Sequence, residues 1–158
     1  MPAFHCEQNG PITDSAILVT MIFIHFHFHF RGKLGQLMTR QQLKNSGKLM
    51  KKSCIPKNSV TEDQVGQIEQ GKFVEERNVM CYVACIYTMT QVIKNNKLSY
   101  DAVIKQIDTM FPVEMRDAVK ASAAHCKDIS KKYKDICEIA YWTAKCMYDY
   151  DPKNFIFP

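Results

Sequence analysis

The stretch that decides the fold runs from Asn78 to Asn95 and reads NVMCYVACIYTMTQVIKN. Its apolar residues recur with the spacing of one helix face, at Val79, Tyr82, Val83, Ile86, Met89, Val92 and Ile93. Cys81 and Cys85 lie four residues apart, so both point to nearly the same side of this helix. Neighbouring side chains on one rigid helix diverge too far to form a comfortable disulfide with each other. Each cysteine therefore needs a partner elsewhere, and we expect other segments to be tied to this helix.

Four further cysteines can supply those partners: Cys54, Cys126, Cys137 and Cys146. Zinc sites favour Cys-x2-Cys knuckles, and the sequence contains none. Six cysteines in a small helical domain are more typical of three disulfides in a secreted protein. They allow fifteen pairings, and spacing alone does not choose among them.

The cysteine register, with Cys-x3-Cys in this stretch and Cys-x8-Cys near the end, resembles the six-cysteine signature of the insect odorant-binding and pheromone-binding proteins (PBP/GOBP). The resemblance covers about Met38 to Pro158. Within the family, three segments look most like the lush-type members of flies: Met80-Cys-Tyr, Thr143-Ala-Lys-Cys146 and Phe155-Ile-Phe-Pro158.

This resemblance implies an all-α fold, a compact bundle of about six helices around an apolar cavity, cross-linked by three disulfides. It implies the pairs Cys54–Cys85, Cys81–Cys137 and Cys126–Cys146.

Capping signals and apolar periodicity independently predict helices over residues 39–54, 61–71, 78–95, 99–111, 112–126 and 130–151. Thr39 with Gln42 and Thr61 with Gln64 fit capping boxes. Asn78 can cap the third helix, and the last is expected to start near Ser130. No segment alternates convincingly like a strand, so we expect no sheet.

Residues 1–37 are expected to be a signal peptide or a poorly ordered extension, and 38–158 the binding domain. The apolar run Ala16 to Phe30 is shorter than the roughly 20 residues that a membrane span needs, and its length fits the apolar core of a signal peptide. The charged residues on either side of this run fit a signal peptide less well. Removal near Gly35 to Met38 would also remove Cys6 and leave six cysteines. We expect no stable membrane insertion of the mature chain.

The segment His25-Phe-His-Phe-His29 could bind a metal if extended, because alternate residues share a face. We favour an export segment, with no metal and no cofactor.

The net charge of +5 is spread out and forms no basic stripe interleaved with aromatics, so no nucleic-acid partner is expected. There is no nucleophile elbow, glycine-rich phosphate loop or histidine–glutamate metal motif. After export only His125 remains, and we predict that the protein is not an enzyme.

Ligand-facing candidates come from the inner helix faces and the tail: Val83, Ile86, Tyr87, Thr90, Met110, Val119, Ala123, Met147, Phe155 and Phe157. Relatives thought to hold small alcohols offer Ser or Thr along the third helix, whereas this chain shows Val83, Tyr87 and Val92 there. We therefore expect a larger or less polar guest, with one hydrogen bond from Tyr87 or Thr90. Ser122 could also supply one, or could bond its own helix. An ordinary packed core would give the same periodicity.

Three bulky apolar residues at the end of the segment 151–158 are costly to expose, and the resemblance implies that this segment folds back as a lid over the cavity. The alternative is a frayed end.

The function implied is a secreted, extracellular carrier of small hydrophobic odorants or pheromones, working in sensillum lymph or another body fluid. An olfactory receptor is a further expected partner, and we expect a monomer or weak dimer. Two alternatives stay open: a non-olfactory carrier of the same fold, and a secreted factor that acts by contacting another protein.

Overall fold

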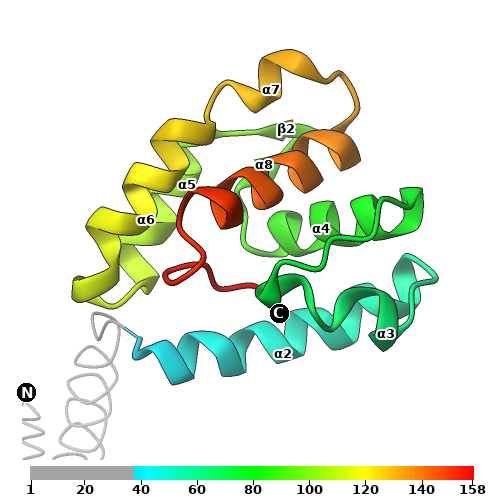
Figure 1. The fold of residues 1–158 in the computed structure, drawn as a ribbon, viewed down its shortest axis with the longest axis horizontal. Helices are drawn as coiled ribbons and strands as arrows, with labels where there is room; N and C mark the ends of the chain where they lie inside the picture. Colours follow the sequence, from blue (N-terminus) through cyan, green and yellow to red (C-terminus); the bar gives the residue numbers. More distant parts are fainter. Residues whose placement is uncertain (1–37) are drawn as a thin grey trace, which may run out of the picture. The chain divides into compact units, whose positions relative to one another are not determined.

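The computed structural model describes residues 38–158, so the expected signal peptide, Cys6 and the histidine run lie outside the part described. The elements of this part, in chain order, are α2 (Arg40–Lys57), α3 (Glu62–Val65), a 3-10 turn (Ile68–Gln70), α4 (Arg77–Met89), β1 (Ile93–Lys94), β2 (Lys97–Leu98), α5 (Tyr100–Met110), α6 (Val113–Cys126), α7 (Ile129–Lys132) and α8 (Ile136–Tyr150) (Figure 1). Between residues 38 and 158 no helix is long and apolar enough to cross a membrane.

Several of these helices begin at the capping residues from which the sequence predicted their starts. Thr39 and Gln42 form a reciprocal capping box at the start of α2, with Gln42 N–H donating to Thr39 Oγ1 at 3.2 Å. Thr61 N–H donates to Gln64 Oε1 at 2.8 Å at the start of α3. Ser99 Oγ accepts from Ala102 N–H at the start of α5. Each cap satisfies backbone groups that have no partner inside the helix.

The third predicted helix is shorter than expected at its C-terminal end and begins before its predicted cap. α4 spans Arg77–Met89 with Glu76 at the N-cap, so the predictions of Asn78 as cap and of a helix reaching Asn95 were wrong. Gln91 has φ of 63°, a left-handed conformation that turns the chain out of the helix. The N–H of Val92 then bonds back to the carbonyl of Tyr87.

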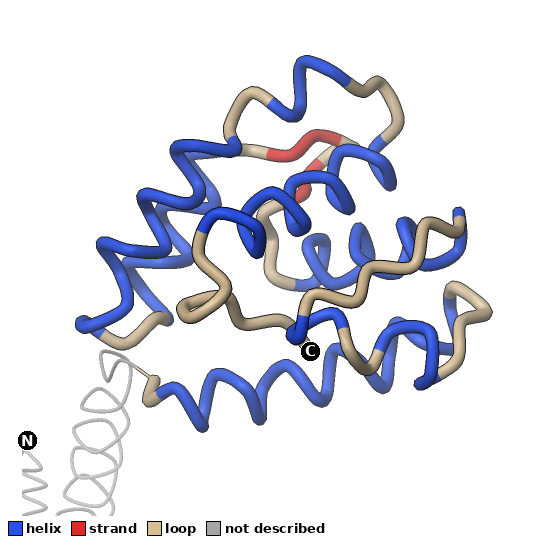
Figure 2. The backbone as a smooth tube through the Cα atoms, in the orientation of Figure 1, coloured by secondary structure: helices blue, strands red, loops and turns tan. Residues whose placement is uncertain are grey.

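A small hairpin follows, and the prediction of no sheet was wrong. β1 and β2 pair antiparallel, with Ile93 opposite Leu98, and appear as the two red segments in Figure 2. Asn95 and Asn96 between them have φ of 50° and 58°. Positive φ at both central residues gives the two-residue turn that best fits the twist of paired strands, and asparagine tolerates it. The strands are two residues each, too short for an alternating pattern to show in the sequence.

The last helix also starts later than predicted. The short helix α7 ends at Lys132, and α8 begins only at Ile136, where Asp135 Oδ1 accepts from the N–H groups of Cys137 and Glu138. The sequence keeps a helical periodicity from Ser130 onward and therefore predicted one helix. The cap at Asp135 begins a new helix inside that stretch, so the structure has two helices, α7 and α8.

Three disulfides join the long helices: Cys54–Cys85, Cys81–Cys137 and Cys126–Cys146. They connect α2 to α4, α4 to α8 and α6 to α8. The predicted fold class, a mostly helical bundle cross-linked by three disulfides, is confirmed.

The apolar core is divided into two clusters. The larger one is buried between α2, α4 and α8 and contains Tyr82, Val83 and Tyr141. The smaller one lies between α5 and α6, with Ile107 and Val119 among its members. Met147 of α8 is partly buried and packs against both clusters, so the two meet along α8.

A pH-dependent ion pair links the start of α4 to the start of α8. Arg77 Nη2 donates to Asp135 Oδ2 at 2.8 Å, and the hydrogen bond from Arg77 lowers the pKa of Asp135 to about 2. The unfolded carboxyl titrates near pH 3.9. The folded pKa is therefore depressed, and the resulting stability is present above about pH 4 and lost as pH falls toward 2.

We predict that Asp135→Asn, which keeps a side-chain cap but removes the charge, lowers the free energy of unfolding by about 0.5–1 kcal/mol near neutral pH, as for other solvent-exposed pairs. Urea denaturation at a series of pH values measures this. The difference from wild type should shrink toward pH 2, and Arg77→Gln should show the same trend. A difference that stays constant with pH would contradict the assignment.

Candidate functional site

A partly enclosed cavity of about 630 Å³ lies inside the bundle and is lined by members of both hydrophobic clusters. Its apolar walls come from α2, the end of α4, the hairpin, α5, α6, α8 and the tail: Leu43, Met50, Ile86, Tyr87, Met89, Val92, Leu98, Val103, Ile107, Met110, Phe111, Val119, Ala123, Met147, Ile156, Phe157 and Pro158. A mostly apolar, concave space of this size is the usual form of a site for a small molecule.

Most of the predicted ligand-facing residues are brought together around this cavity: Ile86, Tyr87, Thr90, Met110, Val119, Ala123, Met147 and Phe157. Val83 and Phe155 are not among the lining residues. Val83 is fully buried in the larger cluster, one turn before Ile86 on α4. Phe155 packs against Phe73 and Tyr148 instead. Which of these residues contact a guest stays a prediction.

Sequence reasoning missed part of the wall. Leu43, Met50, Val103 and Ile107 carry the helical periodicity of inward-facing residues, but periodicity does not distinguish a packed neighbour from an open space. Thr143, one turn before Met147 on the last helix, was not among the predicted ligand-facing residues. It also lines the cavity.

The tail after α8 forms one wall. It returns between α8 and α2, as the red segment in Figure 1 shows. Phe155 and Phe157 are buried in the larger cluster, whereas Ile156 packs against the smaller one. The ring of Phe157 lies 6.3 Å from that of Tyr82 and 6.1 Å from that of Tyr87, both edge-on. The tail therefore joins the two clusters across the cavity.

Polar and close contacts hold this tail against α2 and α4. Arg40 donates to the carbonyl of Lys153 at 2.7 Å, and the hydroxyl of Tyr82 donates to the oxygen of Pro158 at 3.1 Å. A Cβ at Gly47 would lie 3.0 Å from Pro158 Cβ. A glycine inside a helix is destabilising by about 1 kcal/mol relative to alanine, and here its lack of a side chain lets the tail approach α2.

Several hydroxyl groups on the wall are already used by the protein. Ser46 donates to Leu43 O at 2.8 Å, Thr90 to Tyr87 O at 3.1 Å, and Ser130 to Lys127 O at 3.1 Å. The predicted hydrogen bond from Thr90 to a guest thus competes with a local one. Ser122 lies outside the lining and donates to Ala118 O.

Tyr87 presents a phenol at this wall. Burial raises the pKa of Tyr87 above its ordinary value, so the hydroxyl is neutral at physiological pH. It can donate or accept a hydrogen bond without bringing charge into the cavity.

Charged residues line the cavity only along its rim, on α2, on the 3-10 turn and at the C-cap of α6: Lys44, Lys48, Lys51, Glu69 and Lys127. Lys44 Nζ lies 2.8 Å from Glu69 Oε1 and forms an ion pair with it. Glu69 Oε1 accepts no hydrogen bond of good geometry from any group in residues 38–158. The exposed Leu49 and Met89 lie on the same rim. The mouth of the cavity is therefore mixed in character, while its interior is apolar.

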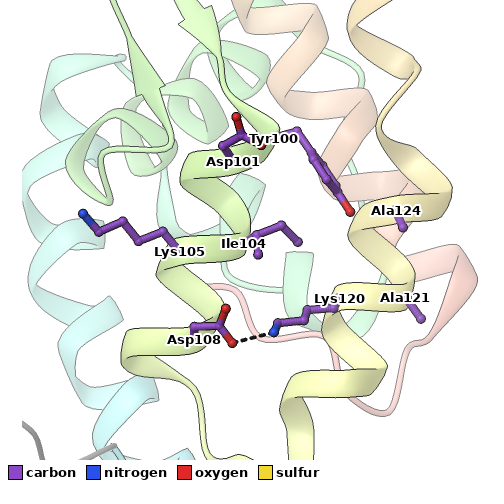
Figure 3. A pocket seen from close by; sticks show the side chains of 8 residues that line it. All are labelled: Tyr100, Asp101, Ile104, Lys105, Asp108, Lys120, Ala121 and Ala124. Carbon is purple, nitrogen blue, oxygen red and sulfur yellow. Dashed lines mark ion pairs between the residues drawn. The ribbon is translucent and has the colours of Figure 1, made fainter.

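A second hollow lies on the surface between α5 and α6 (Figure 3). It is shallow and open, and Asp108 and Lys120 form an ion pair across it. Ala121 and Ala124 form its α6 side and are exposed. This groove lacks the enclosure that burying an apolar guest requires.

Comparison with known proteins agrees with this arrangement. The family model described as the PBP/GOBP family matches residues 36–150. General odorant-binding protein 72 of Anopheles gambiae is 33% identical, over 77% of this chain and 99% of its own. The structure of odorant binding protein 4 of Chrysopa pallens is 35% identical with a TM-score of 0.70, over 77% of this chain and 100% of that one. Odorant binding protein 5 of Apis mellifera is 29% identical with a TM-score of 0.71, over 78% of this chain and 100% of that one.

The two tail phenylalanines make a matched test of the cavity wall. We predict that Phe157→Ala and Phe155→Ala both lower the free energy of unfolding, by about 3 kcal/mol each, because both remove a buried ring. Only Phe157→Ala should also weaken binding of an apolar molecule several-fold, because only Phe157 lines the cavity. Thermal denaturation and fluorescent-probe displacement measure the two effects. An equal loss of affinity in Phe155→Ala would contradict this geometry.

Proposed function

Because this chain belongs to the PBP/GOBP family, a family of odorant-binding carriers rather than enzymes, we propose that it is a secreted carrier of odorants or pheromones. It would hold one small hydrophobic molecule in the cavity and deliver it through aqueous lymph to an olfactory receptor.

The observation that carries this proposal is the apolar cavity of about 630 Å³ inside a cross-linked bundle. An apolar space that water fills poorly takes up apolar guests. The methionines on its wall, Met110 and Met147 among them, are flexible and adapt to guests of varied shape.

The wall favours a guest larger than a short alcohol. Tyr87 and Val92 stand on the wall, and the hydroxyl of Thr90 is bonded to its own helix. A short alcohol would fill little of the space and find few free hydroxyls. A molecule of roughly ten to twenty heavy atoms, bound with a micromolar dissociation constant or about −8 kcal/mol, fits better.

In this proposal the segment 151–158 is the lid of the cavity, and residues 1–37 are removed on export. The buried tail phenylalanines support the first part. Six paired cysteines support the second, because disulfides persist in oxidising compartments. We expect the exported chain to work as a monomer or weak dimer.

The test uses two adjacent alanines on α6. Ala123 lines the cavity, whereas Ala124 is exposed and lines the surface groove. The full chain would be expressed in insect cells and collected from the medium, where its intact mass reports removal of the N-terminal segment. We predict that Ala123→Leu weakens binding of decanol about tenfold, because the new side chain occupies the guest's space, and that Ala124→Leu leaves binding unchanged.

Displacement of an apolar fluorescent probe by decanol gives the dissociation constants, and ethanol should compete far more weakly. If Ala124→Leu weakens binding and Ala123→Leu does not, the guest lies in the surface groove. If no apolar molecule binds saturably, the protein is not a carrier and a protein-contact role becomes the better account.

A further inference from the structure

Residues 127–134, which follow α6 and include α7, carry a high local concentration of positive charge. The eight residues read KDISKKYK and hold four lysines against one carboxylate, that of Asp128. All four lysine side chains are exposed. Lysine-rich segments of about five to eight residues are a sequence sign of polyanion binding, heparin included. The proposed carrier function gives this charge no role.

Little of this charge is neutralised within the protein. Lys131 Nζ lies 2.7 Å from Asp128 Oδ1, and both side chains are exposed. Lys127, Lys132 and Lys134 have no ion-pair partner in the part of the chain that the structure describes. The pKa of Asp128 is lowered, mainly by its bond with Lys131 and further by Lys127 and Lys132. Three ammonium groups therefore act on one carboxylate, and the segment presents a net positive surface to solvent.

The fold holds this segment in place. Cys126 and Cys137 flank it, and disulfides join them to α8 and α4 respectively. Tyr133 is half-buried and stacks on Trp142 of α8, with the ring centroids 5.9 Å apart and the planes 10° from parallel. Charges on a fixed surface lose less freedom on binding than charges on a mobile tail. α7 lies at the opposite edge of the bundle from α2 (Figure 1), so a polymer lying along α7 would not cover the tail.

The side chains of this segment decide which kind of polyanion it fits. Helices that bind membrane surfaces insert apolar side chains, but the large apolar side chains exposed in residues 38–158 lie elsewhere, at Leu49, Met89, Tyr100, Val113 and Tyr150. Single-stranded nucleic acids stack on exposed aromatic rings, whereas Tyr133 is already stacked within the protein. Protein partners bind mainly through buried anchor side chains. A sulfated polysaccharide needs none of these, because cations alone contact its sulfate and carboxylate groups.

We propose that residues 127–134 form a binding surface for a linear sulfated polysaccharide of the heparan sulfate type. Lys132 and Lys134 contact its sulfate groups, and Lys131 is shared between the polymer and Asp128. Lysine suits such a polymer because its ammonium is a compact charge that does not require the planar partner that arginine recognises. Disulfide-bonded proteins persist in oxidising compartments, the extracellular space among them, where such polymers occur. This interaction goes beyond the carrier function, and it would hold the protein at extracellular surfaces without requiring a guest.

The experiment compares two double variants of equal net charge, Lys132→Gln/Lys134→Gln in the segment and Lys52→Gln/Lys57→Gln on α2. The second is the matched control, because α2 carries six basic residues and no acidic one, and both of its substituted lysines are exposed. Full chain collected from insect-cell medium would be passed over immobilised heparin at physiological ionic strength. The segment variant should bind about fivefold more weakly than wild type, the worth of two exposed ionic contacts, and the α2 variant within about twofold.

Heparin stripped of its sulfate groups should bind far more weakly than heparin, and added salt should weaken binding, because exposed charges are screened. Wild-type protein that does not bind heparin would overturn the proposal. So would equal losses in the two double variants, which would mean that net charge alone matters. Tighter binding to phosphatidylserine vesicles than to heparin, lost in the segment variant, would assign the surface to membranes instead. None of the four substituted lysines lines the cavity, so displacement of an apolar probe should be the same in all three proteins and reports separately on fold and carrier function.

Discussion

Two cysteines one helical turn apart on α4 carry the constraint on which the structure depends. Cys85 is bonded to Cys54 of α2, and Cys81 is bonded to Cys137 of α8. With Cys126–Cys146, these bonds connect α2, α4, α8 and α6 in one covalent series. Each cross-link stabilises by about 2–4 kcal/mol, mainly by limiting the unfolded chain. Because these cross-links supply part of the stability that packing would otherwise supply, the helices can surround a cavity that their side chains do not fill.

The cavity is lined by members of both hydrophobic clusters, and the tail contributes side chains to both of them. The tail's alternating side chains place Phe155 and Phe157 in one cluster and Ile156 in the other. The close approach at Gly47 and the hydrogen bonds to Lys153 and Pro158 keep this segment against α2 and α4. A wall made by a terminal segment is easier to open than one made by a cross-linked helix, because few residues must be released. This is the physical basis for assigning the tail the role of lid.

Much of the fold could be predicted because its signals are local. Capping boxes at Thr39 and Thr61 and the spacing of Cys81 and Cys85 fix where helices begin and which one is tied to others. The end of α4 and the start of α8 were missed, since a left-handed Gln91 and the cap at Asp135 act inside stretches that keep helical periodicity. The cavity was less predictable still. Val83 and Ile86 look alike in sequence, yet only Ile86 lines the cavity, because that depends on neighbours from other helices.

The central claim is that an apolar guest occupies the interior of the bundle, and the methionine methyl groups report on this directly. Met110 and Met147 line the cavity, whereas Met80 and Met115 are packed in the clusters outside its lining. Methyl NMR of methionine-labelled protein, titrated with decanol, would follow all four signals at once. The account predicts that the signals of Met110 and Met147 shift and saturate with one bound guest, while those of Met80 and Met115 stay nearly unchanged. Saturable binding that leaves Met110 and Met147 unmoved would contradict it.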